Sequence, residues 1–528
     1  MKHYAKDFIE FVSHSPTAFH ACEAACEALR AAGFSQLKEQ EPWAIAPGGC
    51  YFLTRNRSAV VAFTVPEGGA SHFQIAASHG DSPAFKLKPN AEDLAAGAYV
   101  RLNVERYGGM LMSTWLDRPL SIAGRAVVRE GGRLATKLVD FGRDAVLIPN
   151  MPIHFNREVN DGYKFNPQVD LLPLYGGADA QGKLAEEIAR SCGAAAEDVV
   201  ASDLYLYNRT PGAVWGADGE FFSCPRIDDL ECAYTTLQAF LDAAPAGHVN
   251  VFAMLDNEEV GSGTKQGADS TLLSDALARI AAALGMDGEQ ARAAIASSFM
   301  VSADNAHAVH PNHPEKYDAN NRAFLNAGVV VKHNANQKYT TDAVSAAIFG
   351  EICRRAGVPV QTFVNRSDIL GGSTLGNIAN AHVSMNTVDI GLPQLAMHSC
   401  YETAGTRDLD YMIDAMRAFY RADVRTFAVA GELPSGITGD VPAVHIDFPR
   451  GGFIHSSEDI QHRGLARAAG SYDHDKFPFC DLEAYPVHRH DLHFSCAVDL
   501  GHIFQFYIGI CLTPHRLLPS IRSCFSIL

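Results

Sequence analysis

The amino-acid sequence predicts an α/β fold in which helices cover both faces of a buried sheet. Two observations support this prediction. Short apolar or β-branched runs, which suit buried strands, alternate with stretches of helical periodicity. Residues 93–215 break this alternation, as an inserted unit of another kind would. The chain has 528 residues, enough for about two or three domains of ordinary size.

The first elements along the chain are two helices, expected at residues 3–14 and 17–32. Phe8, Phe11 and Val12 form a stripe of helical period, and Gly33 suits a helix end. The strands that follow are expected at residues 59–65, 73–78, 249–255, 299–302 and 329–332. Helices are expected between several of them, at residues 231–244, 270–284 and 341–355.

Residues 93–215 read as a mostly β insertion. Strand-like pieces at 99–104, 121–128 and 145–148 are broken by glycines and turns, with little helical period until 182–190. The sequence therefore divides into a first part of the main domain (1–92), the insertion (93–215) and a second part of the main domain (216–422).

Residues 423–528 differ in composition from the rest of the chain. Nine of the 22 histidines lie after Tyr420, and no helix or strand period persists there. We expect poor order in this extension. One hypothesis is a read-through or frame-shifted extension. The alternative is a zinc-binding tail built on His488, His490 and His493.

Composition excludes several classes of protein. The chain has 43 Lys and Arg against 60 Asp and Glu, a net charge of −17, which disfavours binding to nucleic acid or to a membrane surface. Asp7 and Glu10 lie where a signal peptide would be apolar, and no apolar run approaches the roughly 20 residues of a membrane-spanning helix. The 12 cysteines include no CxxC pair, so we expect a cytoplasmic protein without a disulfide scaffold.

Side chains that commonly bind metal ions follow the ends of several predicted strands. They lie in five segments: SHGDSP at 78–83, PRIDD at 225–229, DNEEVGS at 256–262, SADNAH at 302–307 and AMHSC at 396–400. Residues in a single segment of this kind more often have a structural role than bind a metal ion. However, ligands from successive strand ends converge at one edge of an open α/β sheet. Two His and several carboxylates suit Zn²⁺, with Mn²⁺ or Co²⁺ as alternatives.

The adjacent Glu258 and Glu259 follow a predicted buried strand. Two such carboxylates repel each other unless a cation compensates them. The sequence indicates that one of the pair is free to move protons, and the residues alone do not say which.

Six strings, in this order, resemble the aspartyl aminopeptidases of the M18 metallopeptidase family: SHGDSP, RIDDL, DNEEVGSG, SADNAHAVHPN, NANQKY and AMHSCYE. The resemblance runs from about Met1 to about Ala422. It implies a two-metal zinc-peptidase sheet interrupted by a dimerisation domain, and a dodecamer built from dimers. The implied reaction is release of an N-terminal residue, preferentially Asp or Glu, from peptides.

The resemblance also implies a set of metal ligands. In the family pattern one Asp bridges two ions, and Asp228 matches that position. One ion would be held by His79 and Asp304, and the other by Glu259 and His398.

Further roles come from the same resemblance. Glu258 matches the general base, and Asp81 matches the residue that orients the metal-binding histidine. Lys332 matches a residue that faces the acidic side chain of the substrate. Tyr339 is a candidate hydrogen-bond donor to the reacting carbonyl, and His154 matches a histidine that reaches into the neighbouring subunit's site.

Two other functions stay open from the residues alone. The same metals would serve a neutral-residue aminopeptidase, a carboxypeptidase or a deacylase, and Lys332 is the feature that distinguishes these from an acidic specificity. The alternative that is not an enzyme is a non-catalytic scaffold that binds peptides. The retained ligand types and Glu258 argue against it.

Overall fold

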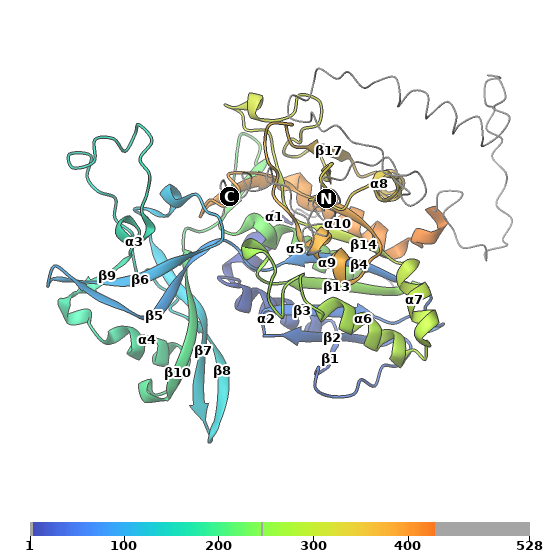
Figure 1. The fold of residues 1–528 in the computed structure, drawn as a ribbon, viewed down its shortest axis with the longest axis horizontal. Helices are drawn as coiled ribbons and strands as arrows, with labels where there is room; N and C mark the ends of the chain where they lie inside the picture. The colour runs from blue at the N-terminus through green and yellow to red at the C-terminus, as the bar shows by residue number, and fades with distance from the viewer. Residues whose placement is uncertain (1–3, 244–245, 428–528) are drawn as a thin grey trace, which may run out of the picture. The chain divides into compact units, whose positions relative to one another are not determined.

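The computed structural model describes residues 4–243 and 246–427, whose strands form three sheets (Figure 1). Every strand expected in the main domain is present. The poor order expected for residues 423–528 is a prediction about residues that lie outside the described ones, except for 423–427. No helix in residues 4–243 and 246–427 combines the length and apolar character needed to cross a membrane.

The largest sheet has nine strands and carries the main core. Their spatial order is β1 (Ser35–Gln36), β2 (Cys50–Arg55), β3 (Ala59–Thr64), β13 (Val249–Leu255), β4 (Phe73–His79), β14 (Phe299–Ala303), β18 (Asn386–Gly391), β16 (Val329–His333) and β17 (Val360–Val364). The central strands β13, β4, β14 and β18 run parallel. Every residue of β4 and β13 is buried, which explains their continuous apolar sequence.

Helices pack on both faces of this sheet, as predicted. Alternate residues of β4 point to opposite faces: Ala76 joins one apolar cluster, while Ile75 and Ala77 join another. The first cluster includes α1 (Ala5–Ser13), α2 (Ala18–Ala31), α5 (Ile227–Asp242), α8 (Ala343–Ala356) and α10 (Thr406–Arg421). The second includes α6 (Leu272–Ala283), α7 (Gly288–Ala296) and α9 (Leu375–His382).

The helix ends follow local sequence signals. Asp342 caps α8 by accepting a hydrogen bond from the backbone N–H of Ser345, whose hydroxyl accepts one from Asp342 N–H in return. Gly357 ends this helix with φ +71°, a left-handed conformation that glycine adopts without strain.

The six-stranded sheet is antiparallel throughout. Its order is β8 (Arg133–Asp140), β7 (Leu120–Glu130), β10 (Val199–Asn208), β5 (Ala84–Ala95), β6 (Tyr99–Tyr107) and β9 (Leu174–Gly177). The helices α3 (Pro167–Asp170) and α4 (Lys183–Ser191) belong to this part of the chain, with single 3₁₀ turns η1 (Met112–Trp115), η2 (Ala178–Ala180) and η3 (Ala196–Asp198).

This sheet differs from expectation in several ways, beginning with β8, β9 and β10, which were not predicted. The strand β5 runs across the boundary expected between residues 92 and 93. Its register shifts between Leu87 and Glu92, around a proline and an asparagine that hide the strand pattern in the sequence. The strand expected at 145–148 is wrong, because that segment makes only isolated bridges, such as Leu120 with Val146.

A small five-stranded sheet was not predicted. It comprises β11 (Ala213–Trp215), β12 (Phe221–Cys224), β20 (Glu402–Gly405), β19 (Pro393–Leu395) and β15 (Ala306–His307). Three further 3₁₀ turns complete the secondary structure of the described residues: η4 (Glu258–Val260), η5 (Pro314–Lys316) and η6 (Val424–Phe427). This sheet joins segments that follow or precede the predicted metal-binding strings, and so brings them to one place.

Candidate metal centre

The predicted metal-binding segments meet at the carboxyl edge of the nine-stranded sheet. His79 is the last residue of β4, Glu258 and Glu259 follow β13 in η4, and Asp304 follows β14. Asp228 comes from the start of α5, and His398 from the loop between β19 and β20. Because β4, β13 and β14 run parallel, their ends deliver these side chains to the same edge.

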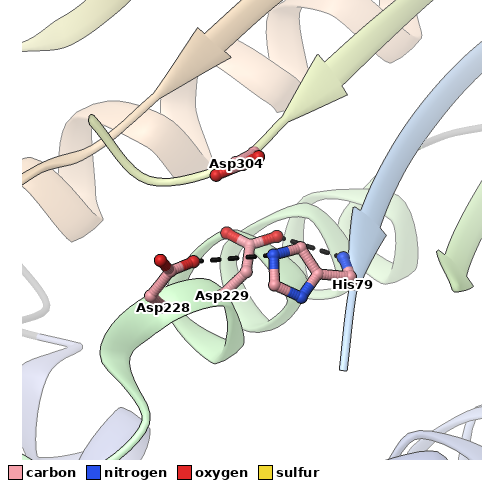
Figure 2. Close-up of side chains that lie close together, drawn as sticks. All are labelled: His79, Asp228, Asp229 and Asp304. Atoms are coloured by element: carbon pink, nitrogen blue, oxygen red, sulfur yellow. Dashed lines mark hydrogen bonds and ion pairs between the residues drawn. The ribbon is translucent and has the colours of Figure 1, made fainter. Parts of the chain in front are cut away.

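One cluster consists of His79, Asp228, Asp229 and Asp304, all buried (Figure 2). Their potential ligand atoms all lie within 4.8 Å of one another. Nε2 of His79 lies 3.5 Å from Oδ1 of Asp228. Asp229, joined to Asp228 by a cis peptide bond, was not predicted as a site residue, and its Oδ2 accepts a hydrogen bond from the backbone N–H of His79 at 3.1 Å.

A second cluster consists of Asp228, Glu259 and His398. Nε2 of His398 lies 3.3 Å from Oδ2 of Asp228 and 3.4 Å from Oε2 of Glu259. Asp228 therefore faces His79 with one carboxylate oxygen and His398 with the other. A ligand shared between two ion positions needs this arrangement.

The chemistry of this donor set fits divalent cations. Oδ1 of Asp228, Oδ1 of Asp229 and Oε1 of Glu259 are buried and have no hydrogen-bond partner in the described part of the chain. Burial, together with the charge of Asp228, raises the pKa of Glu259 well above its ordinary value. Buried carboxylates without donors are costly unless a cation neutralises them, and imidazole with carboxylate is a typical zinc ligand set.

Asp81 organises the surroundings of His79. Nδ1 of His79 lies 3.1 Å from the carbonyl oxygen of Asp81 and 3.3 Å from its Oδ1, which leaves Nε2 for a metal ion. The Asp81 carboxylate also accepts hydrogen bonds from the backbone N–H groups of Glu258 and Glu259, at 3.1 and 3.2 Å. The residue therefore ties the end of β4 to the turn η4.

The carboxyl group of Glu258 has no hydrogen-bond partner among residues 4–243 and 246–427. Burial, aided by the negative charges of Asp304 and Asp81, raises the pKa of Glu258 to about 8. Cations bound to the neighbouring carboxylates would lower this pKa, because they reverse the local charge.

The three predicted substrate-contact residues lie in different surroundings. Lys332 is only 2% exposed, and its ammonium donates to the carbonyl oxygens of Asp304 and Asn305 at 2.8 and 3.3 Å. Tyr339 is buried beside it, with its ring centroid 5.2 Å from Nζ of Lys332. His154 is exposed in the loop between β8 and α3 and makes no hydrogen bond or ion pair with any described residue.

Glu402, which was not predicted as a site residue, connects two of the predicted metal-binding segments. Its buried carboxylate accepts hydrogen bonds from the backbone N–H groups of Ile227, Asp228 and His398, at 2.6, 3.1 and 2.7 Å. The residue ends the string AMHSCYE, which was the only signal for it in the sequence. Tyr107 was also missed, because its contact with Asp81 joins two separate sheets.

Comparisons with known proteins agree with this geometry. The family described as aminopeptidase I zinc metalloprotease (M18) matches residues 11–420. A probable M18 family aminopeptidase 2 of Clostridium acetobutylicum is 46% identical over 425 residues, which cover 79% of this chain and 98% of that protein.

Solved structures resemble the fold as well. The cryo-EM structure of the Ape4 and Nbr1 complex has a TM-score of 0.78 at 35% identity, covering 81% of this chain and 87% of that one. The S. cerevesiae mApe1 dodecamer has a TM-score of 0.72 at 27% identity, covering 81% of this chain and 99% of that one.

Proposed function

Because the chain belongs to the M18 family of zinc metalloproteases, we propose that it is a two-ion aminopeptidase that releases N-terminal Asp or Glu from peptides. The observation that carries the proposal is the placement of Asp228, whose two carboxylate oxygens face His79 and His398. One ion would be held by His79, Asp228 and Asp304. The other would be held by Asp228, Glu259 and His398.

Zn²⁺ is the proposed ion, with Mn²⁺ or Co²⁺ as alternatives. When bound, such ions supply Lewis-acid polarisation of the scissile carbonyl and lower the pKa of water. The protein's own contribution is to hold the ligands in place through Asp81 and Glu402 and to move protons.

Glu258 is the proposed general base. Its unpaired carboxylate removes a proton from the attacking water as the new C–O bond forms. The same carboxyl group then donates that proton to the amine nitrogen as the C–N bond breaks, which restores the carboxylate. Burial raises the pKa of Glu258 in the metal-free site, and bound ions would lower it toward the carboxylate form that accepts the proton.

The preference for acidic residues rests on Lys332. Two of its three N–H donors serve backbone carbonyl groups, and Nζ lies 3.7 Å from Oδ1 of Asp304. A substrate carboxylate that competed for the third donor would gain a charge-assisted hydrogen bond. Tyr339 would donate its hydroxyl hydrogen to the substrate carbonyl oxygen as negative charge develops there.

Assembly into dimers, and from dimers into a dodecamer, is the proposed quaternary structure. The loop between β8 and α3, with α3 itself, exposes large apolar side chains: Met151, Ile153, Phe155, Tyr163 and Val169. Exposed apolar side chains within one segment favour contact with another chain. His154 lies among these residues, which supports its proposed reach into a neighbouring subunit's site. The free thiols of the described cysteines suit the proposed cytoplasmic location.

A substrate panel tests the proposal. Aspartyl, glutamyl, leucyl and lysyl peptides would each be incubated with Zn²⁺, Mn²⁺ or a chelator. We expect fast release of Asp and Glu, lost on chelation. Metal-dependent release of Leu instead would keep the metal site and reject the acidic preference. No release with any metal would favour a non-catalytic scaffold.

The variant Lys332→Met separates the pocket from the metal site. We expect its kcat/KM to fall about tenfold to 100-fold more for aspartyl than for leucyl peptides, because only the former lose a charge-assisted bond. Lys86→Met, which removes a cation of the six-stranded sheet, is the matched control. Equal losses for both substrates, with reduced metal content, would show that Lys332 only supports Asp304.

A further inference from the structure

The six-stranded sheet contacts the metal centre through the end of β6. Tyr107, the last residue of this strand, donates a hydrogen bond from its hydroxyl to Oδ2 of Asp81 at 2.6 Å. The same hydroxyl oxygen accepts a hydrogen bond from Nδ2 of Asn257 at 2.8 Å. We propose that Tyr107 is a positioning residue of the metal centre, which fixes the Asp81 carboxylate and thereby His79. The inference rests on the proposed two-ion function.

The contacts of Asp81 show what the tyrosine adds. Oδ1 of Asp81 faces Nδ1 of His79 and the backbone N–H of Glu258, while Oδ2 accepts from the backbone N–H of Glu259 and from Tyr107. The tyrosine hydroxyl is therefore the one of these four partners that comes from the six-stranded sheet. Without it, Oδ2 keeps a single, longer hydrogen bond, and the carboxylate is held less firmly beside His79.

Asn257 fixes the direction of the tyrosine hydrogen bond. Because its Nδ2 donates to the hydroxyl oxygen, the hydroxyl hydrogen has to point elsewhere, and Asp81 is the acceptor in reach. The amide of Asn257 is itself oriented, since its Oδ1 accepts from Thr264 and Gln266 at 2.9 and 2.8 Å. Tyr107 thus links the loop after β4 to the residue that precedes the Glu258–Glu259 pair.

The surroundings keep the tyrosine protonated and in place. Burial, followed by the charge of Asp81, raises the pKa of Tyr107 far above its ordinary value, so its hydroxyl remains a donor. The ring of Tyr205 on β10 packs edge-on against it, with centroids 5.6 Å apart. Both rings belong to the six-stranded sheet, which therefore sets where the hydroxyl lies.

The residues that follow Tyr107 contact ligands of the second cluster. A Cβ atom on Gly108 would lie 3.1 Å from Cβ of Glu259, and the backbone N–H of Leu111 donates to the carbonyl oxygen of His398 at 3.0 Å. The end of β6 and the loop after it therefore contact Asp81, Glu259 and His398. The position of this segment is coupled to both proposed ion positions.

The test compares two tyrosine variants by zinc affinity, measured by competition with a chromogenic chelator. Tyr107→Phe removes only the hydroxyl. Tyr207→Phe is the matched control, since its hydroxyl donates to Asp140 of β8 at 2.7 Å in the same sheet. We expect Tyr107→Phe to weaken zinc binding about tenfold to 100-fold with little change in Tm, as is typical of residues that orient a metal ligand. Tyr207→Phe should stay within about twofold of wild type.

A double-mutant cycle with Asp81→Ala adds a second measurement. If the tyrosine acts through Asp81, Tyr107→Phe should cost little further affinity once Asp81 is absent. Additive losses, or a wild-type affinity in Tyr107→Phe, would overturn the inference while leaving the two-ion function intact. Equal losses in both tyrosine variants would also overturn it. A wild-type protein that binds no zinc would overturn the proposed function and this inference together.

Discussion

The nine-stranded and six-stranded sheets bury their strands differently, although they meet at one site. In the nine-stranded sheet, β4 and β13 are buried along their whole length because helices cover both faces. In the six-stranded sheet, buried residues of β6 alternate with exposed or half-buried ones, and β8 is mostly accessible. The first sheet holds most of the proposed ligands at its strand ends. The second supports them from outside and carries the exposed apolar loop.

This difference in burial suits the two sheets to two different roles, holding the metal centre in place and contacting another chain. A strand packed on both faces has little freedom, so the side chains at its end keep a fixed geometry. A sheet covered on one face leaves surface for another chain. Substitutions in each sheet should therefore have different effects, and the largest is expected at the metal centre.

The proton exchange assigned to the nine-stranded sheet is tested by Glu258→Gln. We expect kcat to fall by about 10³-fold or more with zinc content and Tm unchanged, because the amide cannot accept the proton from water. Peptidase assays with metal analysis measure both. Glu289→Gln, on the exposed surface of α7, is the control. A fall of less than about tenfold in kcat would remove Glu258 from the role of general base.

The support given by the six-stranded sheet is tested by Gly108→Ala. Its new Cβ would press on Glu259, so we expect a loss of roughly tenfold to 100-fold in zinc affinity, as for other groups that orient metal ligands. Gly131→Ala in the β7–β8 turn introduces a similar backbone strain, with φ +59° against +75°, but has no neighbour within 4 Å. If both variants lose the same affinity, strain alone is responsible.

The exposed loop is tested by Phe155→Ser. This side chain is 82% exposed, and its burial between chains would contribute about 1.5–3 kcal/mol, so we expect subunit association to weaken about tenfold or more. Sedimentation velocity measures the change. Leu134→Ser on β8, 66% exposed, should leave association unchanged. The reverse result would place the interface on the β7–β8 hairpin.

The smallest effect concerns an ion-pair cluster on the six-stranded sheet. Burial alone would raise the pKa of Asp203, but Lys86 and Arg125 outweigh it and hold the pKa below its ordinary value. The folded pKa is therefore below the unfolded one. The stabilisation is present above about pH 4 and is lost as the pH falls through the folded pKa.

We expect Asp203→Asn to lower the free energy of unfolding by about 1 kcal/mol at pH 7 and by less as the pH approaches 3. Urea unfolding of the metal-free protein measures this. The more exposed Asp93–Arg101 pair gives the control, and Asp93→Asn should cost less. A cost that grows toward low pH would contradict the assignment.

The sequence predicted the parts of the structure that depend on local pattern. Continuous apolar runs predicted β4 and β13, and the residues just after such runs predicted His79 and the Glu258–Glu259 pair as site candidates. The strand β5 was missed because its register shift interrupts the pattern. Tyr107 and Glu402 were missed for another reason, since their contacts with Asp81 and with Ile227 join residues far apart in the chain, and the local sequence does not show such contacts.

The carboxylate of Glu402 has a consequence for how the centre fills. It accepts hydrogen bonds from Asp228, the ligand shared by both clusters, and from His398 of the second. In the proposed two-ion centre, an adjustment at one position is transmitted to the other through this shared acceptor. The two binding equilibria are then linked, and by thermodynamic reciprocity each ion changes the affinity for the other by the same factor. Metal titrations should accordingly show two binding steps whose affinities depend on each other.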